Sequence, residues 1–166
     1  FKDKNDYKDI FEKTLLACEK FSYKKYIIYP NYDPGYKSII KTINKFKKKN
    51  CFVFKSIERQ DFLTLMGHAQ ALVGNSSAGL LESSSLKVGV VNIGDRQNLR
   101  EGNKNIFNAK YEEKDIYQKI KKAINIKEKL NNIKNIHGDG RSAVRIYKVL
   151  KKIKKSQTLL TKNTTY

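Results

Sequence analysis

The feature that most constrains the fold is the alternation of short apolar runs with longer segments whose apolar residues recur every three or four positions. A short apolar run bounded by turn residues is typical of a buried strand, and the longer spacing is typical of an amphipathic helix. We expect strands at 26–29, 51–54, 71–73 and 88–93, with a weaker extended piece near 105–107. We expect helices at 6–21, 39–46, 59–69, 113–130 and 141–155, with a short one after the strand at 71–73.

Strands that alternate with helices at this spacing predict a parallel sheet, because consecutive parallel strands need a crossover, which a helix provides. Such crossovers are right-handed, and they cover both faces of the sheet. The sequence therefore predicts a Rossmann-like three-layer α/β domain. The length of 166 residues suits one domain. We expect that domain to span residues 1–155, followed by a polar tail at 156–166.

The sequence lacks the fingerprints of several common enzyme classes. It contains no GxGxxG, GxxxxGK(S/T) or HExxH motif, so dinucleotide-fingerprint, P-loop and zinc-protease assignments lose their support. Cys18 and Cys51 have no CxxC spacing, and we expect buried, reduced thiols. His68 and His137 each stand alone, and no His or Lys is placed to activate the run Ser83-Ser84-Ser85. We expect no metal ion and no cofactor.

The net charge of +19 is typical of a protein that binds nucleic acid. The distribution of the charge argues against that function. Residues 56–100, which carry the polar loops discussed next, hold four basic and four acidic side chains, and the basic surplus lies on both sides of them. A Lys, Asn and Ile bias on solvated surfaces explains this surplus, and we do not expect a nucleic-acid partner.

No uninterrupted apolar run is long enough to span a bilayer, and no signal-peptide pattern is present. We therefore expect a cytoplasmic protein without a membrane partner. The chain begins with Phe1 rather than Met, and its polar opening suggests a piece of a longer protein.

Residues 74–82, with the sequence Gly-Asn-Ser-Ser-Ala-Gly-Leu-Leu-Glu, join a predicted strand to a helix start. A helix start offers unpaired N–H groups, and the hydroxyls of Ser76 and Ser77 suit an anionic oxygen. Glu82 lies one turn further on, where a carboxylate can accept hydrogen bonds from sugar hydroxyls. An ordinary helix cap explains the same residue types, so this segment alone leaves both interpretations open.

A second polar loop follows the predicted strand at 88–93. It begins Gly94-Asp95-Arg96-Gln97 and places a permanently charged guanidinium where a parallel strand ends. Ligands of open α/β sheets bind at this carboxyl edge. Two consecutive strand ends with polar loops of this kind are harder to explain by helix capping, and they favour an anion-binding site.

These two loops resemble motifs of the UDP-N-acetylglucosamine 2-epimerases, and specifically of the hydrolysing branch that feeds sialic-acid-type sugars. The first motif is Asn-Ser-Ser-x-Gly-x-x-Glu, and the second is Val-Asn-Ile-Gly-x-Arg-Gln-x-x-Arg. Three further landmarks follow the family's order: the loop at 29–35, the helix motif at 62–69 and the Gly-Asp-Gly at 138–140. Together they span about residues 26–150.

The resemblance implies the C-terminal half of a GT-B-like two-domain enzyme that closes over UDP-N-acetylglucosamine or UDP. It also implies a role for each matching residue. Ser76 and Ser77 would contact the phosphates, Glu82 the ribose hydroxyls and Phe62 the surroundings of the uracil. Asn31 and Arg96 would complete the pocket. The implied reaction eliminates UDP across C1 and C2 of the sugar and then adds water, which gives N-acetylmannosamine.

The resemblance also implies that parts of the enzyme lie outside this chain. The family's proposed acid and base carboxylates belong mostly to the N-terminal domain, and a His-containing loop precedes the first helix of this domain. We therefore expect no catalytic residue in residues 1–166 and no turnover by this chain alone. We expect the missing N-terminal domain as a partner, and a homo-oligomer.

Two other functions stay open at this point. The donor-binding domain of a GT-B glycosyltransferase has the same fold and ligand class but transfers a sugar to an acceptor. A basic nucleic-acid-binding module would use the surplus lysines. The choice between UDP-linked and GDP-linked sugars also stays open, as does feedback by an activated sialic acid.

Overall fold

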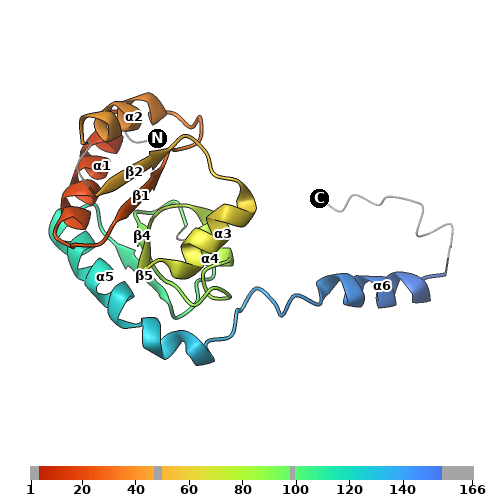
Figure 1. Ribbon diagram of the computed structural model, residues 1–166. Coiled ribbons are helices and arrows are strands. Elements are labelled where there is room, and N and C mark those ends of the chain that lie inside the picture. The colour runs from red at the N-terminus through yellow and green to blue at the C-terminus, as the bar shows by residue number, and fades with distance from the viewer. Residues whose placement is uncertain (1–3, 47–49, 98–99, 155–166) are drawn as a thin grey trace. The chain divides into compact units, whose positions relative to one another are not determined.

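The computed structural model describes residues 4–46, 50–97 and 100–154 (Figure 1). The chain divides into two compact units, Phe1–Lys134 and Asn135–Tyr166. The helices are α1 Lys4–Glu19, α2 Tyr36–Lys45, α3 Arg59–His68, α4 Ser77–Leu81, α5 Glu113–Asn125, the 3-10 helix η1 Lys127–Asn132, and α6 Ser142–Lys152. The strands are β1 Lys25–Ile28, β2 Cys51–Phe54, β3 Ala71–Gly74, β4 Gly89–Ile93 and β5 Ile106–Ala109.

All strand pairs of the first unit are parallel, as the alternation of strands and helices predicts. β1 pairs with β2 in the register Lys25 to Cys51. β4 is the central strand of a second group and pairs with β3 and β5. The parallel α/β architecture predicted from the sequence is therefore confirmed.

The strands form two hydrogen-bonded groups rather than one, because no ladder joins β1 to β3 within the described residues. A cavity of about 550 Å³ is lined by side chains from both of these strands and from α1 and α3. It is predominantly apolar and includes Ile28, Leu65 and Leu72. A cavity lined mainly by apolar side chains thus lies beside the two strands that form no ladder with each other.

The core of the first unit lies between α5 and the group β3–β4–β5. Its buried members come from α1, β4, β5 and α5, namely Ala17, Val91, Ile93, Ala109, Ile116, Ile120 and Ala123. Helix and strand approach closely at Gly89, where an added Cβ would lie 2.2 Å from the backbone oxygen of Ala123. Any larger residue at this position would force α5 away from the sheet.

Several helix boundaries differ from the sequence prediction by a few residues, and two of these differences have a clear structural basis. The predicted helix at 113–130 ends at Asn125, and the chain continues as the 3-10 helix η1. The helix predicted from residue 39 begins earlier, at Tyr36, because Gly35 adopts a φ of 90° and its backbone oxygen accepts from the amide of Ser38. Glycine reaches this conformation without steric cost, so it starts the helix at once.

A buried polar cluster closes the connection between α4 and β4. Asn105 donates through Nδ2 to Ser83 Oγ and to the backbone oxygen of Val88, and its Oδ1 accepts from Ser84 Oγ. All four residues are buried. Ser83 and Ser84 therefore serve packing and hydrogen bonding, in agreement with the sequence interpretation that they are not nucleophiles.

The second unit contains the Gly-Asp-Gly segment and α6. Asp139 forms a bidentate ion pair with Arg145, with distances of 2.8 and 2.7 Å, and also accepts from the backbone N–H of Arg141. These donors hold the pKa of Asp139 well below its usual range, the Arg145 side chain having the largest effect. The predicted domain boundary at 155 and the tail at 156–166 lie outside the described residues.

Within the described residues, no helix has the length and hydrophobicity needed to cross a bilayer.

Candidate functional site

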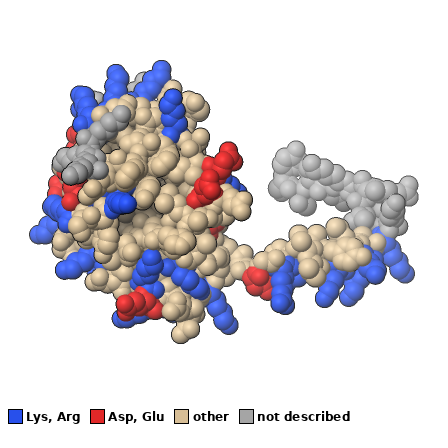
Figure 2. Space-filling view, in the orientation of Figure 1, with Lys and Arg blue, Asp and Glu red and all other residues tan. Residues whose placement is uncertain are grey.

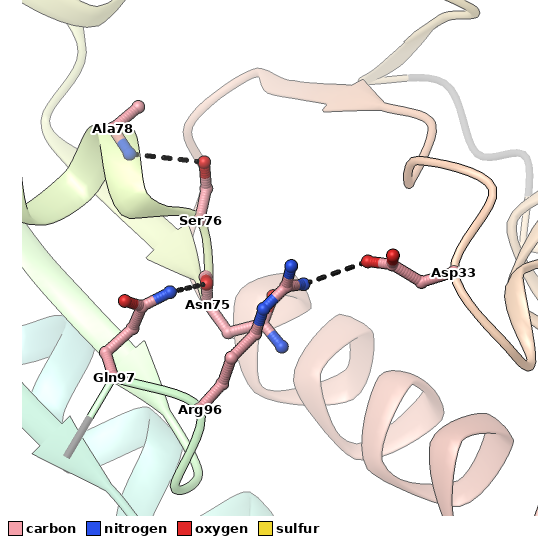
Figure 3. A network of polar contacts seen from close by, with 6 residues as sticks. All are labelled: Asp33, Asn75, Ser76, Ala78, Arg96 and Gln97. Atoms are coloured by element: carbon pink, nitrogen blue, oxygen red, sulfur yellow. Dashed lines mark hydrogen bonds and ion pairs between the residues drawn. The ribbon is translucent and has the colours of Figure 1, made fainter. Parts of the chain in front are cut away.

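Three loops meet at the carboxyl ends of β1, β3 and β4 (Figure 3). One carries Asp33, one carries Asn75 and Ser76, and one carries Arg96 and Gln97. Parallel strands place their following loops at one edge of a sheet, which is where α/β proteins bind ligands. The structure thus brings together the two polar loops that the sequence analysis selected and the loop after β1, in which the resemblance places Asn31.

Ser76 occupies the turn between β3 and α4. It is the N-cap of α4, and its Oγ accepts from the backbone N–H of Ala78 at 3.4 Å. The backbone N–H of Gly79 also has a partner, the backbone oxygen of Ser76. The capping interpretation is therefore correct for Ser76, and fewer first-turn amides are available to an anion than the sequence suggested.

The hydroxyls of this turn nevertheless stay accessible. Ser76 is exposed and Ser77 is half-buried. An added Cβ at Gly74, whose φ is 151°, would meet no atom of the described residues within 4 Å. The turn therefore faces open space, and a hydroxyl that accepts from an amide can still donate its own proton.

Glu82 lies at the end of α4, where it faces the start of α3. Its Oε1 lies 2.6 Å from Nη2 of Arg59, and its side chain is 22% exposed. Its Oε2 is buried and has no hydrogen-bond partner among the described residues. One carboxylate oxygen is therefore engaged by a cation, and the other is shielded from solvent in this arrangement. Sequence reasoning did not identify Arg59, which carries no motif signal.

Arg96 projects from the loop after β4 toward the loop after β1. Its Nη1 lies 3.0 Å from Oδ2 of Asp33, and both side chains are more than half exposed. The loop turns at Gly94, which has a φ of 76°. An added Cβ there would lie 2.1 Å from the hydroxyl oxygen of Tyr111. Glycine at this position lets the chain turn sharply and present the guanidinium at the strand end.

Gln97 is a further residue to which sequence reasoning gave no role. It is only 5% exposed, and its Nε2 donates to the backbone oxygen of Asn75 at 2.8 Å (Figure 3). Among the residues that the structure describes, its buried Oε1 has no partner. The residue stood inside the second motif beside Arg96, but its contact with the turn after β3 depends on the tertiary arrangement.

A second, polar cavity of about 170 Å³ lies beside Gln97. It is also lined by Asn92 and Asn108, which are joined by a hydrogen bond of 2.9 Å from Nδ2 of Asn92 to Oδ1 of Asn108. Oδ1 of Asn92, like Oε1 of Gln97, is buried and has no partner within the described part of the chain. Buried amide oxygens of this kind need a donor, and a polar cavity of this size has room for a water molecule to be that donor.

The remaining predicted site residues lie apart from this hydrogen-bonded network. Phe62 is half-buried on α3 and lines the apolar cavity together with Leu65 and Met66. Asn31 is exposed in the loop after β1. The network of Figure 3 therefore contains Ser76 and Arg96, whereas Phe62 and Asn31 are not part of it.

The described basic side chains of the first unit do not form a single patch on the face shown in Figure 2. On the face shown in Figure 2, the Lys and Arg side chains described in the first unit are scattered mainly around its rim. Cys18 lines the apolar cavity, and burial raises the pKa of its thiol to about 11. Within the described residues, no cluster of three or more His, Cys, Asp or Glu could hold a metal ion.

Comparison with known protein families assigns the chain to one of them. The profile of the family described as UDP-N-acetylglucosamine 2-epimerase matches residues 1–151. The chain belongs to this family. The resemblance derived from the two polar loops is thereby confirmed, and the matched range includes every predicted site residue.

Relatives within the family include two named hydrolysing enzymes. A UDP-N,N'-diacetylbacillosamine 2-epimerase of Legionella pneumophila is 29% identical over 157 residues, which cover 94% of this chain and 41% of the relative. A GDP/UDP-N,N'-diacetylbacillosamine 2-epimerase of Campylobacter jejuni is 33% identical over 117 residues, which cover 68% of this chain and 30% of the relative. The chain therefore spans well under half the length of these relatives.

The fold matches solved structures of the same family. The UDP-GlcNAc 2-epimerase of Methanocaldococcus jannaschii, determined in complex with UDP-GlcNAc and UDP, superposes with a TM-score of 0.70 and 21% identity. The match covers 90% of this chain and 41% of that structure. It confirms the predicted fold class, a Rossmann-like half of a GT-B-like two-domain enzyme.

Proposed function

We propose that the full-length protein is a UDP-N-acetylglucosamine 2-epimerase of the hydrolysing type, which makes N-acetylmannosamine and UDP for sialic-acid-type sugar synthesis. The observation that carries the proposal is the joining of the Ser76 turn and the Arg96 loop at one sheet edge, in a chain of this family. Residues 1–155 form the nucleotide-binding half in this proposal, and the missing N-terminal domain forms the other half. We expect a cytoplasmic homo-oligomer.

The proposed pocket assigns each side chain a part of UDP that fits its chemistry. The hydroxyls of Ser76 and Ser77 donate to the phosphates, and the guanidinium of Arg96 neutralises their charge. Glu82 accepts from the ribose hydroxyls when they displace Arg59 from Oε1, because Oε2 is buried in the free protein. Phe62 offers an aromatic face near the uracil, and Asn31 closes the pocket beside Asp33.

The mechanism of this half is stabilisation of the leaving group. When the bond between C1 of the sugar and the β-phosphate oxygen breaks, negative charge grows on the diphosphate. Arg96 and the two serine hydroxyls are placed to stabilise that charge, and hydrogen bonds to charged groups are stronger than neutral ones. Proton removal at C2 and the later addition of water require groups outside residues 1–166, so this half contributes no catalytic acid or base.

A second substrate is favoured by a specific comparison. The relative that covers nearly all of this chain is named for UDP-N,N'-diacetylbacillosamine. That sugar shares the 2-acetamido group and the UDP leaving group with UDP-N-acetylglucosamine, so the same half would bind both. Another relative is named for both GDP-linked and UDP-linked sugars, so the nucleotide base of the substrate is tested as well.

The test uses the full-length protein with each nucleotide sugar and no acceptor. A hydrolysing epimerase releases UDP and the free C2-epimer, seen by ¹H NMR as N-acetylmannosamine or its diacetamido counterpart. Faster turnover of one substrate assigns the sugar, and a GDP-linked sugar serves as the base control. An inert donor would point to a glycosyltransferase. Salt-sensitive RNA binding that survives loss of Ser76 and Arg96 would point to the nucleic-acid module.

A further inference from the structure

Gln97 is a buried side chain at the junction of two loops of the proposed site. It follows Arg96 directly, and its Nε2 reaches across to the backbone oxygen of Asn75 at 2.8 Å (Figure 3). Asn75 precedes the turn of Ser76 and Ser77. One hydrogen bond therefore connects the loop with the guanidinium to the turn with the two hydroxyls.

The orientation of the Gln97 amide is determined by its surroundings. Turning the amide over would place Oε1 against the Asn75 oxygen, which would oppose two acceptors and lose the bond. In the observed orientation Oε1 has no partner in residues 4–46, 50–97 and 100–154, and the residue lines the polar cavity with Asn92 and Asn108. Water in that cavity can donate to Oε1. Nε2 thus donates to the Asn75 oxygen, and Oε1 is left to accept from the cavity side.

We propose that Gln97 is a positioning residue for the diphosphate end of the nucleotide pocket, acting through the Asn75 carbonyl to hold the Ser76–Ser77 turn against the Arg96 loop. The inference rests on the proposed function. Gln97 itself does not touch the nucleotide. Its effect falls on the phosphate contacts and spares those of the base and ribose, which Phe62 and Glu82 make from α3 and α4.

The test compares the binding of UDP and of uridine to the full-length protein. Gln97→Met keeps the length of the side chain but removes the donor. Gln97→Glu keeps the shape but replaces the donor with an acceptor that is negatively charged at neutral pH. We expect each variant to bind UDP about tenfold more weakly or worse, as expected for a lost hydrogen bond in a positioned site. Uridine affinity should change less than twofold, because uridine carries no phosphate.

UDP titrations at a series of pH values separate a positioning role of Gln97 from general damage to the fold. When the introduced carboxyl is protonated, it regains an O–H that can donate to the Asn75 oxygen. The UDP affinity of Gln97→Glu, expressed relative to wild type at each pH, should therefore recover as the pH falls. The affinity of Gln97→Met should show no such recovery. Gln118→Glu on the exposed part of α5 adds the same charge elsewhere and serves as the matched control.

Each outcome decides the inference. Selective loss of UDP binding with intact uridine binding supports it, and intact uridine binding also shows that the variant is folded. Wild-type UDP affinity in both variants overturns it. Equal loss of UDP and uridine also overturns it, in favour of a general structural role. If the wild-type protein binds no UDP, the proposed function fails first, and the positioning role fails with it.

Discussion

Arg96 and Asp33 form an ion pair of 3.0 Å between residues that are 63 positions apart in the chain. The pair connects the loop after β4 to the loop after β1, across the region where β1 and β3 form no ladder among the described residues. Both side chains are exposed. Exposed pairs contribute only about 0–1 kcal/mol to stability, so the pair holds the guanidinium at the site without locking it there.

Replacing Arg96 tests the phosphate contact. Arg96→Ala should weaken UDP binding by about 1.5–3 kcal/mol, the range for a hydrogen bond to a charged group. Isothermal titration calorimetry on the full-length protein measures this change. Lys121→Ala removes the same charge from an exposed position on α5 and should leave the affinity unchanged. An unchanged affinity for Arg96→Ala would show that the phosphates bind elsewhere.

Replacing Asp33 should change the affinity for UDP in the opposite direction. In the free protein the carboxylate of Asp33 competes with phosphate for Arg96, so Asp33→Asn should strengthen UDP binding modestly at low salt. The gain should shrink as salt screens the exposed charges. The same titrations at about 0.05 and 0.5 M NaCl measure it. Weaker binding that does not depend on salt would instead mean that Asp33 itself contacts the ligand.

Replacing Glu82 tests its proposed contact with the ribose hydroxyls. Glu82→Ala should weaken UDP binding by about 1–3 kcal/mol, because ribose hydroxyls lose a charged acceptor. The loss should be smaller for a UDP analogue that lacks the 2′-hydroxyl. Arg59→Ala is the companion variant, since it removes the cation that engages Glu82 in the free protein. Equal losses for both nucleotides would place Glu82 away from the 2′-hydroxyl.

Asp139 gives a prediction about pH. Its pKa in the folded state lies below its usual range because Arg145 and the Arg141 amide stabilise the carboxylate. A depressed pKa adds stability above the unfolded carboxyl pKa of about 4, and that stability is lost as the pH falls through the lower folded value. Helicity of the α6 segment should therefore fall below about pH 4 in the wild type and vary less in Asp139→Asn. NMR shifts of α6 amides across this range measure the effect.

The sequence predicted most of the fold because its strands and helices carry strong local patterns. Every expected strand appears near its predicted range, and the core of β4 and α5 follows their apolar spacing. The break after Asn125 was missed, because Ile126 and Leu130 continue the helical apolar pattern across it.

The site was predictable only in part, for a physical reason. Motifs identify residue types, and they indicated Ser76, Glu82 and Arg96. The partners are brought to the site by contacts between segments that are distant in the sequence, namely Asp33, Arg59 and Gln97. A buried glutamine between two polar loops carries no local signal that distinguishes it from a surface glutamine.

The most direct test of the account is a crystal structure of the full-length protein with UDP. We predict diphosphate oxygens within hydrogen-bond distance of the Ser76 and Ser77 hydroxyls and of the Arg96 guanidinium, with Gln97 still bonded to the Asn75 oxygen. UDP bound away from this loop edge, or a diphosphate that contacts neither Ser76 nor Arg96, would contradict the central claim.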